Sequence, residues 1–410
     1  MKQTQCSLIA AAAALLGGLV GFDSAAQSKA STPAEFVMKH IRESEGPASS
    51  ASAAAIHKRQ QEELKSKRNV RKFDLTGLPA YRPKQQVSGT VRLWGTNYIA
   101  NSGLDAKWRD KFLSYHPNAK VDLVLPTAAA AAPALYFGLA DIGMNHELTF
   151  YDYLSHERIL GYSPTHFSVV NGSFDVTGWQ NTMAIVVHKD NPLAKITMEE
   201  LDGVFGAQRA GGWDGFQWRP DWARGPEKNI RKWGQLGLKG EWAEKPIQTY
   251  GYSIRYATAV EFSNRVLKSS DKWNENIMAH GNYVAPDGKR TIQVQRIIAD
   301  LRKDPYGIAY VRWQPGFDKE LKVLALAKDS GGPYFDFTPE NVQARRWPLW
   351  GDQSFWVSIK PGTRIDPKVA EFIRFVLSRE GQQLVMEDGL YLPLDAEASK
   401  QGLETLSRFE

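Results

Sequence analysis

Apolar segments of strand length alternate with amphipathic segments of helix length, and this alternation constrains the fold more than any other feature. Thr90–Trp94 alternates as a strand does, and Val121–Leu125 is a second candidate strand. The segment between them places three apolar residues on one helical face: Leu104, Trp108 and Phe112. Met183–Val187 is typical of a strand buried in a parallel sheet. Strands separated by helices predict an α/β protein with mainly parallel sheets.

The C-terminal part of the chain contains the clearest helix signal. Apolar residues recur there at helical spacing, so that one face should pack on a core: Val369, Phe372, Ile373, Val376 and Leu377. Asp366 and Pro367 predict the start of this helix, and Gly381 and Gly389 predict helix ends. Thr197–Glu200 has the capping-box pattern and predicts another helix start.

The first 26 residues have the organisation of a cleavable signal peptide. Lys2 precedes the apolar run Leu8–Phe22, and Ser24–Ala26 offers the small residues that a signal peptidase needs. The run is shorter than the ~20 apolar residues of a transmembrane helix. The only cysteine, Cys6, precedes the run, so we expect neither a lipid anchor, a disulfide nor a cysteine-type zinc site. These features predict a soluble protein exported to a bacterial periplasm.

The remaining composition is ordinary, but the charge is unevenly distributed. A chain of 410 residues with 42% hydrophobic and 23% charged residues suits two lobes with additional segments. Seven basic and two acidic residues between Ile56 and Lys72 account for five of the six net positive charges. This segment belongs to an Ala/Ser-rich extension, residues 27–86. We interpret it as a solvated linker helix or a contact with anionic lipid, and we expect no nucleic-acid partner.

Several motifs, taken together and in order, identify a family. The sequence from Val87 to Leu394 resembles the phosphate-type periplasmic solute-binding proteins, whose motifs are matched by Ile185–Pro192, Ile196–Phe205, Arg231–Trp242, Tyr306–Tyr310 and Phe372–Leu394. The resemblance implies a receptor that captures phosphate or a related oxyanion for an ABC transporter. It implies a membrane permease as partner, a monomeric state, no cofactor and no catalytic activity.

The resemblance also implies an architecture, the two-lobed type II periplasmic-binding-protein fold with a hinge of two crossover strands. Lobe 1 would comprise residues 87–178 and 346–410, and lobe 2 would comprise residues 179–345 with a Trp-rich insertion at 207–245. The ligand would lie in the cleft where the carboxyl ends of strands meet helix N-termini, and hinge closure would bury it.

In the resembled family, amides and hydroxyls at helix N-termini hold the oxyanion in three loops. The first loop places Thr96 and Asn97 at the ligand, and the second places Thr127, Ala128 and His146 there. This chain departs from the family in the second loop, because alanines replace a glycine-serine-glycine run and His146 replaces an aspartate. A neutral imidazole could accept a ligand proton and a charged one could pair with the anion, but His146 is equally compatible with a turn at the rim.

The third loop supplies Ser253, Arg255, Tyr256 and Thr258. Thr258 and Phe262 keep the family's threonine-to-phenylalanine spacing, whereas Tyr256 and the residue after it replace a serine and a glycine. The family's arginine position falls on Tyr252. Arg255 could swing in as a bidentate clamp or could be a solvated surface arginine.

Two further hypotheses remain open. The Ala-rich loop and the tryptophans of the insertion are compatible with a receptor for a neutral or aromatic-compatible solute. A phosphoester hydrolase on the same fold is a third possibility, with His146 as its candidate catalytic residue. The sequence lacks a Gly-x-Ser-x-Gly elbow, a Walker loop and a His-Glu-x-x-His motif. His146, His156 and His166 are spaced by ten residues, which favours structural roles over metal binding.

Overall fold

The structure, a computed structural model, describes residues 71–410 apart from 175–181, 216, 314 and 317. The predicted signal peptide (1–26), most of the extension (27–86) and the predicted lobe boundary at residues 178 and 179 lie outside the described residues. Among the residues that are described, no helix is both long and apolar enough to cross a bilayer.

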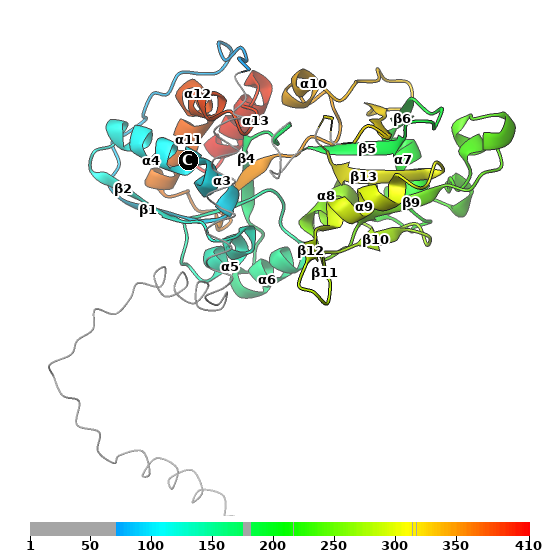
Figure 1. The fold of residues 1–410 in the computed structure, drawn as a ribbon. Coiled ribbons are helices and arrows are strands. Elements are labelled where there is room, and N and C mark those ends of the chain that lie inside the picture. Colours follow the sequence, from blue (N-terminus) through cyan, green and yellow to red (C-terminus); the bar gives the residue numbers. More distant parts are fainter. Residues whose placement is uncertain (1–70, 175–181, 216, 314, 317) are drawn as a thin grey trace, which may run out of the picture. The chain divides into compact units, whose positions relative to one another are not determined.

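The first of two five-stranded sheets has the order β2-β1-β3-β16-β4. Its strands are β1 (Gly89–Gly95), β2 (Ala119–Val124), β3 (Ile142–Asn145), β4 (Thr165–Val170) and β16 (Gln353–Val357). The helices of this half are α3 (Asn97–Ser102), α4 (Leu104–Tyr115), α5 (Ala131–Tyr136), α6 (Phe150–Leu160), α11 (Pro367–Leu377), α12 (Arg379–Asp388) and α13 (Ala396–Ser407). Figure 1 shows segments far apart in sequence brought together here, with the orange and red helices α11–α13 beside the cyan α4.

The second sheet has the order β10-β9-β13-β5-β14. Its strands are β5 (Met183–His188), β9 (Gln248–Tyr252), β10 (Met278–His280), β13 (Gly307–Arg312) and β14 (Leu321–Val323). Its half also contains α7 (Met198–Phe205), α8 (Ala257–Val266), α9 (Gln293–Leu301), α10 (Pro339–Gln343) and three two-stranded sheets. Those small sheets pair β6 (Lys195–Thr197) with β15 (Ala325–Ala327), β7 (Gly212–Asp214) with β8 (Gln217–Arg219), and β11 (Tyr283–Val284) with β12 (Arg290–Thr291).

The two five-stranded sheets follow one topology. In each, three parallel strands are followed by a strand antiparallel to both of its neighbours: β16 in the first sheet and β5 in the second. The chain crosses from the first sheet to the second between β4 and β5, and it returns before β16. The prediction that Met183–Val187 is a parallel strand was therefore wrong. Burial on both faces gives an apolar run whatever the direction of the neighbouring strands.

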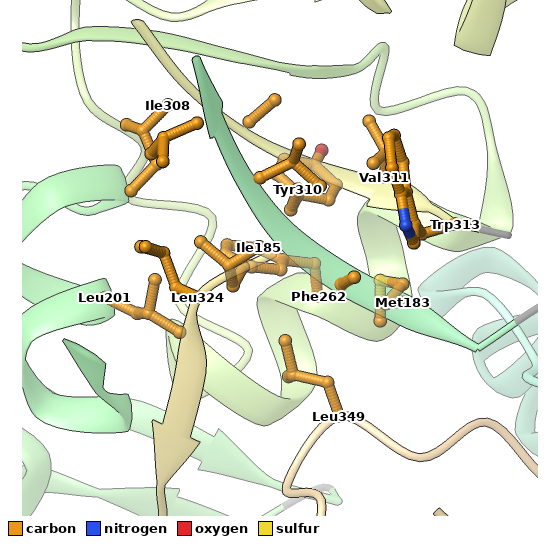
Figure 2. Close-up of a cluster of buried hydrophobic side chains, with 14 of the residues drawn as sticks. Met183, Ile185, Leu201, Phe262, Ile308, Tyr310, Val311, Trp313, Leu324 and Leu349 are labelled. Atoms are coloured by element: carbon orange, nitrogen blue, oxygen red, sulfur yellow. The ribbon is translucent and has the colours of Figure 1, made fainter. Parts of the chain in front are cut away.

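Each half has its own hydrophobic core. The predicted apolar faces are buried in the first core, including Leu104, Trp108 and Phe112 of α4 and Phe372 of α11. In the second core, Phe262 of α8 stacks on Tyr310 of β13, with ring centroids 4.0 Å apart. Figure 2 shows side chains of β5, α8 and β13 meeting in this cluster.

The ordered body begins ahead of Val87. Leu78 and Tyr81, which belong to the predicted extension, are buried, and Tyr81 packs in the first core. The Tyr81 hydroxyl donates to Glu371 Oε2 (2.9 Å) and lies 2.7 Å from His116 Nε2. Part of the predicted extension therefore belongs to the folded protein. The sequence did not indicate this, because no helical pattern of apolar residues marks these positions.

The helix signals at the C-terminus were mostly correct. Asp366 caps α11 and Gly389 caps α12 in a left-handed conformation, as predicted. The prediction of a helix end at Gly381 was wrong, because Gly381 lies inside α12. A Cβ at Gly381 would collide with the Phe375 carbonyl oxygen, so this glycine allows close approach between α11 and α12. The predicted capping box of Thr197 and Glu200 is present at α7.

Candidate functional site

Three loops of the first half begin at one edge of its sheet. Strands β2, β1 and β3 are parallel, so their carboxyl ends lie together. The Thr96 amide, which follows β1, donates to the Met144 carbonyl of β3 (2.9 Å). Gly95 has a φ of +148°, and a Cβ there would collide with the same carbonyl. Glycine therefore permits the close approach of the loops that follow β1 and β3.

The predicted residues of the first two loops differ from one another in burial and in hydrogen bonding. Thr96 is buried and caps α3, where its hydroxyl accepts from the Tyr98 amide (3.4 Å). Asn97 is half-buried at the first position of α3, and Ala128 is half-buried at the first position of η1 (Ala128–Ala130). Thr127 is exposed, and its side chain makes no capping hydrogen bond to η1.

The second half presents a matching edge at the ends of β9 and β13. These strands are parallel, and hydrogen bonds between tyrosines fix their ends. The Tyr310 hydroxyl donates to the Tyr252 carbonyl and accepts from the Tyr252 amide, both at 3.1 Å. The Arg312 amide donates to the Tyr252 hydroxyl (3.0 Å). Arg312 is therefore held where β13 ends.

The third predicted loop joins β9 to α8. The Ser253 amide donates to His280 (2.9 Å), and the Tyr256 hydroxyl accepts from the Asn282 amide (2.8 Å). Tyr256 is the N-cap of α8, and Thr258 is half-buried in its first turn. Arg255 is exposed. The loop is thus anchored at both ends.

Arg312 is the arginine that contacts Thr258. Its Nε donates to the Thr258 hydroxyl oxygen (3.4 Å), and its guanidinium is ion-paired with Glu261 of α8. Sequence reasoning missed both Arg312 and Glu261. Two signals in the sequence could have revealed them. Arg312 is a charged residue that follows the apolar run Gly307–Val311, and Glu261 is an acidic residue on the buried face of α8.

Glu261 is only 3% exposed and is ionised despite its burial. Burial alone favours the protonated carboxyl, but Arg312, Arg265 and His146 together outweigh it and lower the pKa of Glu261. Arg265 Nε lies 3.5 Å from Glu261 Oε1. One buried carboxylate is therefore shared by two guanidinium groups, which gives the cluster a net positive charge.

His146 connects the first half to this cluster. It follows β3, and both of its ring nitrogens are enclosed without a hydrogen-bond partner among the described residues. Burial first and the charge of Arg312 second lower the pKa of His146 to about 4, while Glu261 opposes the shift. The charge of Arg312 also opposes the rise that burial causes in the pKa of Tyr98 of α3. Arg312 thus contacts Thr258 directly and influences the pKa values of His146 and Tyr98.

Glu147, the next residue, is a second unusual acid. Burial first and the neighbouring Glu261 second raise its pKa to about 8, while Arg265 opposes the shift. At neutral pH Glu147 is therefore mainly a neutral carboxylic acid, and His146 is a neutral imidazole. Both groups can donate hydrogen bonds without carrying charge.

The chain crossings between the two sheets pass against this cluster. A Cβ at Gly351 would lie 2.9 Å from Arg312 Nη1, and a Cβ at Gly172 would lie 2.6 Å from the Gly351 carbonyl oxygen. The guanidinium carbon of Arg265 lies over the Trp350 ring, 4.6 Å from the ring centroid. The two crossings therefore contact each other beside the cluster.

The arrangement suits the binding of an anion. Arg312, the Thr258 hydroxyl and the amides at the start of α8 are donors, and the helix dipole adds positive potential there. Among the described residues, no group of three or more histidine, cysteine, aspartate or glutamate side chains could hold a metal ion.

Comparison with known proteins gives a sequence match over most of both chains. No family model matches the chain. The phosphate-binding protein PstS of Pseudomonas aeruginosa, strains PAO1 and UCBPP-PA14, is 29% identical over 331 residues, covering 80% of this chain and 90% of the relative.

Solved structures with weaker likeness include an ABC-type phosphate transport receptor from Vibrio cholerae and PstS from Borrelia burgdorferi. The first is 17% identical with a TM-score of 0.43, covering 74% of this chain and 99% of that one. The second is 14% identical with a TM-score of 0.45, covering 75% and 100%. The sequence match and the topology that the two sheets follow point the same way. The chain is similar in sequence to the phosphate-type periplasmic solute-binding proteins, and its fold is the type II periplasmic-binding-protein fold.

Proposed function

We propose that this protein is a receptor that captures phosphate or a closely related oxyanion between its two halves. The observation that carries the proposal is the position of Arg312, which contacts Thr258 on α8 and lies close enough to His146 to shift its pKa. The relatives that match over most of their length are named as phosphate-binding proteins, which supports this ligand class.

The geometry explains how binding would work. Glu261 holds the Arg312 guanidinium in place, so little side-chain freedom is lost when an oxyanion accepts its hydrogen bonds. Thr96, Asn97, Ala128 and Thr127 follow the strands of the first half, and we propose that hinge closure carries them toward the anion. Ser253, Tyr256 and Thr258 would supply hydroxyl and amide groups from the second half. No step of this process makes or breaks a covalent bond, so the protein acts by binding and not by catalysis.

We further propose that the receptor works in the periplasm and delivers its ligand to the membrane permease of an ABC transporter. The predicted signal peptide supports export. Two halves joined by two crossings support a change of shape on binding that a membrane partner can recognise.

Thermal unfolding and titration calorimetry with inorganic phosphate test the proposal. A ligand at ~100 times its dissociation constant adds about 2.7 kcal/mol to the stability of the folded state, which is readily measured. We expect Arg312→Met to weaken phosphate binding roughly 100-fold, because it removes a charged hydrogen-bond donor from an enclosed site. Arg255→Met is the matched control, since Arg255 is exposed, and should leave affinity within about threefold.

Arg312→Lys keeps the charge and guards against misfolding of the methionine variant. It should fold, and it should bind less tightly than the wild type because lysine cannot donate bidentately. Absence of stabilisation by phosphate or arsenate would refute the proposed function. Equal losses in Arg312→Met and Arg255→Met would refute the proposed site.

A further inference from the structure

The described part of the predicted extension, residues 71–86, contacts both hydrophobic cores, and we call it the strap. Figure 1 shows it in blue beside α12. We infer that the strap is a third connection between the two halves, and that Phe73 acts in it as a latch that holds the halves in the arrangement in which they meet at Arg312. The effect of this latch on ligand affinity rests on the proposed function, whereas its effect on the movement of the halves does not.

The strap is bound to the first half by hydrogen bonds to the start of α12. Nη2 of Arg379 donates to the Leu78 carbonyl, and the Arg379 amide donates to the Pro79 carbonyl, both at 2.9 Å. The Tyr81 amide donates to Glu380 Oε2 (2.6 Å), and the Tyr81 ring is buried in the first core. The strap therefore moves with the first half.

Phe73 joins the strap to the second core. Its amide donates to Met386 Sδ of α12 (3.2 Å), while its half-buried side chain packs against the second hydrophobic core. Two residues earlier, the Arg71 guanidinium carbon lies 5.5 Å from the ring centroid of Phe174. Phe174 belongs to the crossing between β4 and β5. The strap thus reaches the second core beside a crossing.

Ring contacts connect this crossing to the second sheet. The ring centroids of Phe174 and Phe337 lie 4.7 Å apart, and those of Phe337 and Trp347 lie 5.0 Å apart. Trp347 Nε1 donates to the Met183 carbonyl of β5 (2.9 Å). The rings that the strap approaches are therefore anchored on the second sheet, whereas the strap itself is anchored on the first half.

A rotation of the halves about the crossings would break the contact of Phe73. The strap is held by α12 and the rings are held by β5, so such a rotation displaces one anchor from the other. Phe73 would then be exposed to water, which is unfavourable for an apolar side chain. The contact therefore favours the described arrangement, in which the ring nitrogens of His146 are enclosed and Arg312 lowers its pKa.

Titration of variants with inorganic phosphate tests the effect on affinity. When only one arrangement binds the ligand, the apparent affinity falls in proportion to the population of that arrangement. We expect Phe73→Ala to raise the dissociation constant about tenfold. Phe73→Leu keeps an apolar side chain, guards against misfolding of the alanine variant, and should raise the dissociation constant less.

Tyr81→Phe is the matched control within the strap. It removes hydroxyl contacts to Glu371 and His116, which belong to the first half. We expect it to lower the unfolding temperature and to leave the dissociation constant within about threefold of the wild type. Equal losses of affinity in Phe73→Ala and Tyr81→Phe would overturn the inference, because the effect would then be a general loosening of the strap.

Spin labels measure the movement of the halves without any ligand. Cys6, the only cysteine, lies in the predicted signal peptide, so Lys120→Cys and Lys239→Cys give each half one label at an exposed position. We expect Phe73→Ala to broaden the distribution of label separations and Tyr81→Phe to leave it unchanged. An unchanged distribution in Phe73→Ala would overturn the inference and leave the proposed function intact. If the wild type does not bind phosphate, the proposed function fails, and the label separations still decide whether the latch exists.

Discussion

The two halves of this protein place different chemistry at equivalent positions. Strand β3 of the first sheet and β13 of the second occupy the same place in the two sheet orders. The first is followed by neutral His146, whereas the second ends with charged Arg312, which a buried glutamate holds. The comparison teaches that the second half places a fixed positive charge there. The first half places a neutral side chain that can both donate and accept hydrogen bonds.

The largest expected effect concerns the charge pair of the second half. Glu261→Gln leaves Arg312 and Arg265 without their buried counter-charge, and we expect it to lower the free energy of unfolding by about 3–5 kcal/mol, measured by urea denaturation. His146→Asn, at the equivalent place in the first half, should cost less than about 1 kcal/mol. Glu241→Gln on the surface serves as the control. Equal losses in the two halves would remove the distinction drawn here.

The next largest effect is on the pH dependence of stability, and it concerns Glu147 of the first half. The pKa of Glu147 is raised from its ordinary value of 4.5 to about 8, so between these two pH values the folded state binds more protons than the unfolded state. Its stabilising contribution is present below pH 4.5 and is lost as pH rises through 8. Glu147→Gln cannot titrate, so we expect it to be more stable than the wild type at pH ~8 relative to pH ~5, on the order of 1–4 kcal/mol. Parallel pH profiles of the two proteins would show that Glu147 titrates normally.

The contact between the crossings and Arg312 provides a smaller effect. Gly351→Ala introduces a methyl group 2.9 Å from Arg312 Nη1, which must move the guanidinium. We expect phosphate affinity to fall about tenfold, or about 1.4 kcal/mol, by calorimetry. Gly331→Ala is the control, because a Cβ there meets nothing within 4 Å. Unchanged affinity in Gly351→Ala would mean that the exact position of Arg312 does not limit binding.

The smallest expected effects distinguish two threonines of the first half. Thr96 is a buried helix cap, and Thr96→Ala should cost about 1 kcal/mol of stability. Thr127 is exposed and makes no cap, so Thr127→Ala should stay within about 0.5 kcal/mol. Chemical denaturation of both variants measures the difference. A comparable cost at both positions would imply that Thr127 makes a contact that exposure conceals.

Patterns confined to one segment predicted the fold well. The apolar face of α11, the capping box of Thr197 and the cap at Gly389 all depend on neighbouring residues, and all are present. The direction of β5 was not predictable in this way, because it depends on which strands pair with it. The sequence does not distinguish a glycine that lets two helices approach each other from a glycine that ends a helix, and Gly381 is of the first kind.

The candidate site depended more strongly on tertiary structure. The loops at Thr96, His146 and Thr258 were located from strand–turn–helix patterns together with the family resemblance. Arg312 was not, because it is distant in sequence from Thr258 and approaches it only through the parallel pairing of β9 and β13. The exposure of Arg255 was equally invisible, since a loop sequence does not indicate which side faces solvent.

The position of β16 has a consequence for how the chain matures. The first sheet needs Gln353–Val357 between β3 and β4, and its core needs the helices that follow. Strands β3 and β4 therefore wait for a partner strand that begins roughly 180 to 210 residues after they end, and contacts of such long separation form slowly. A nascent chain that lacks its final quarter has no complete first core to close.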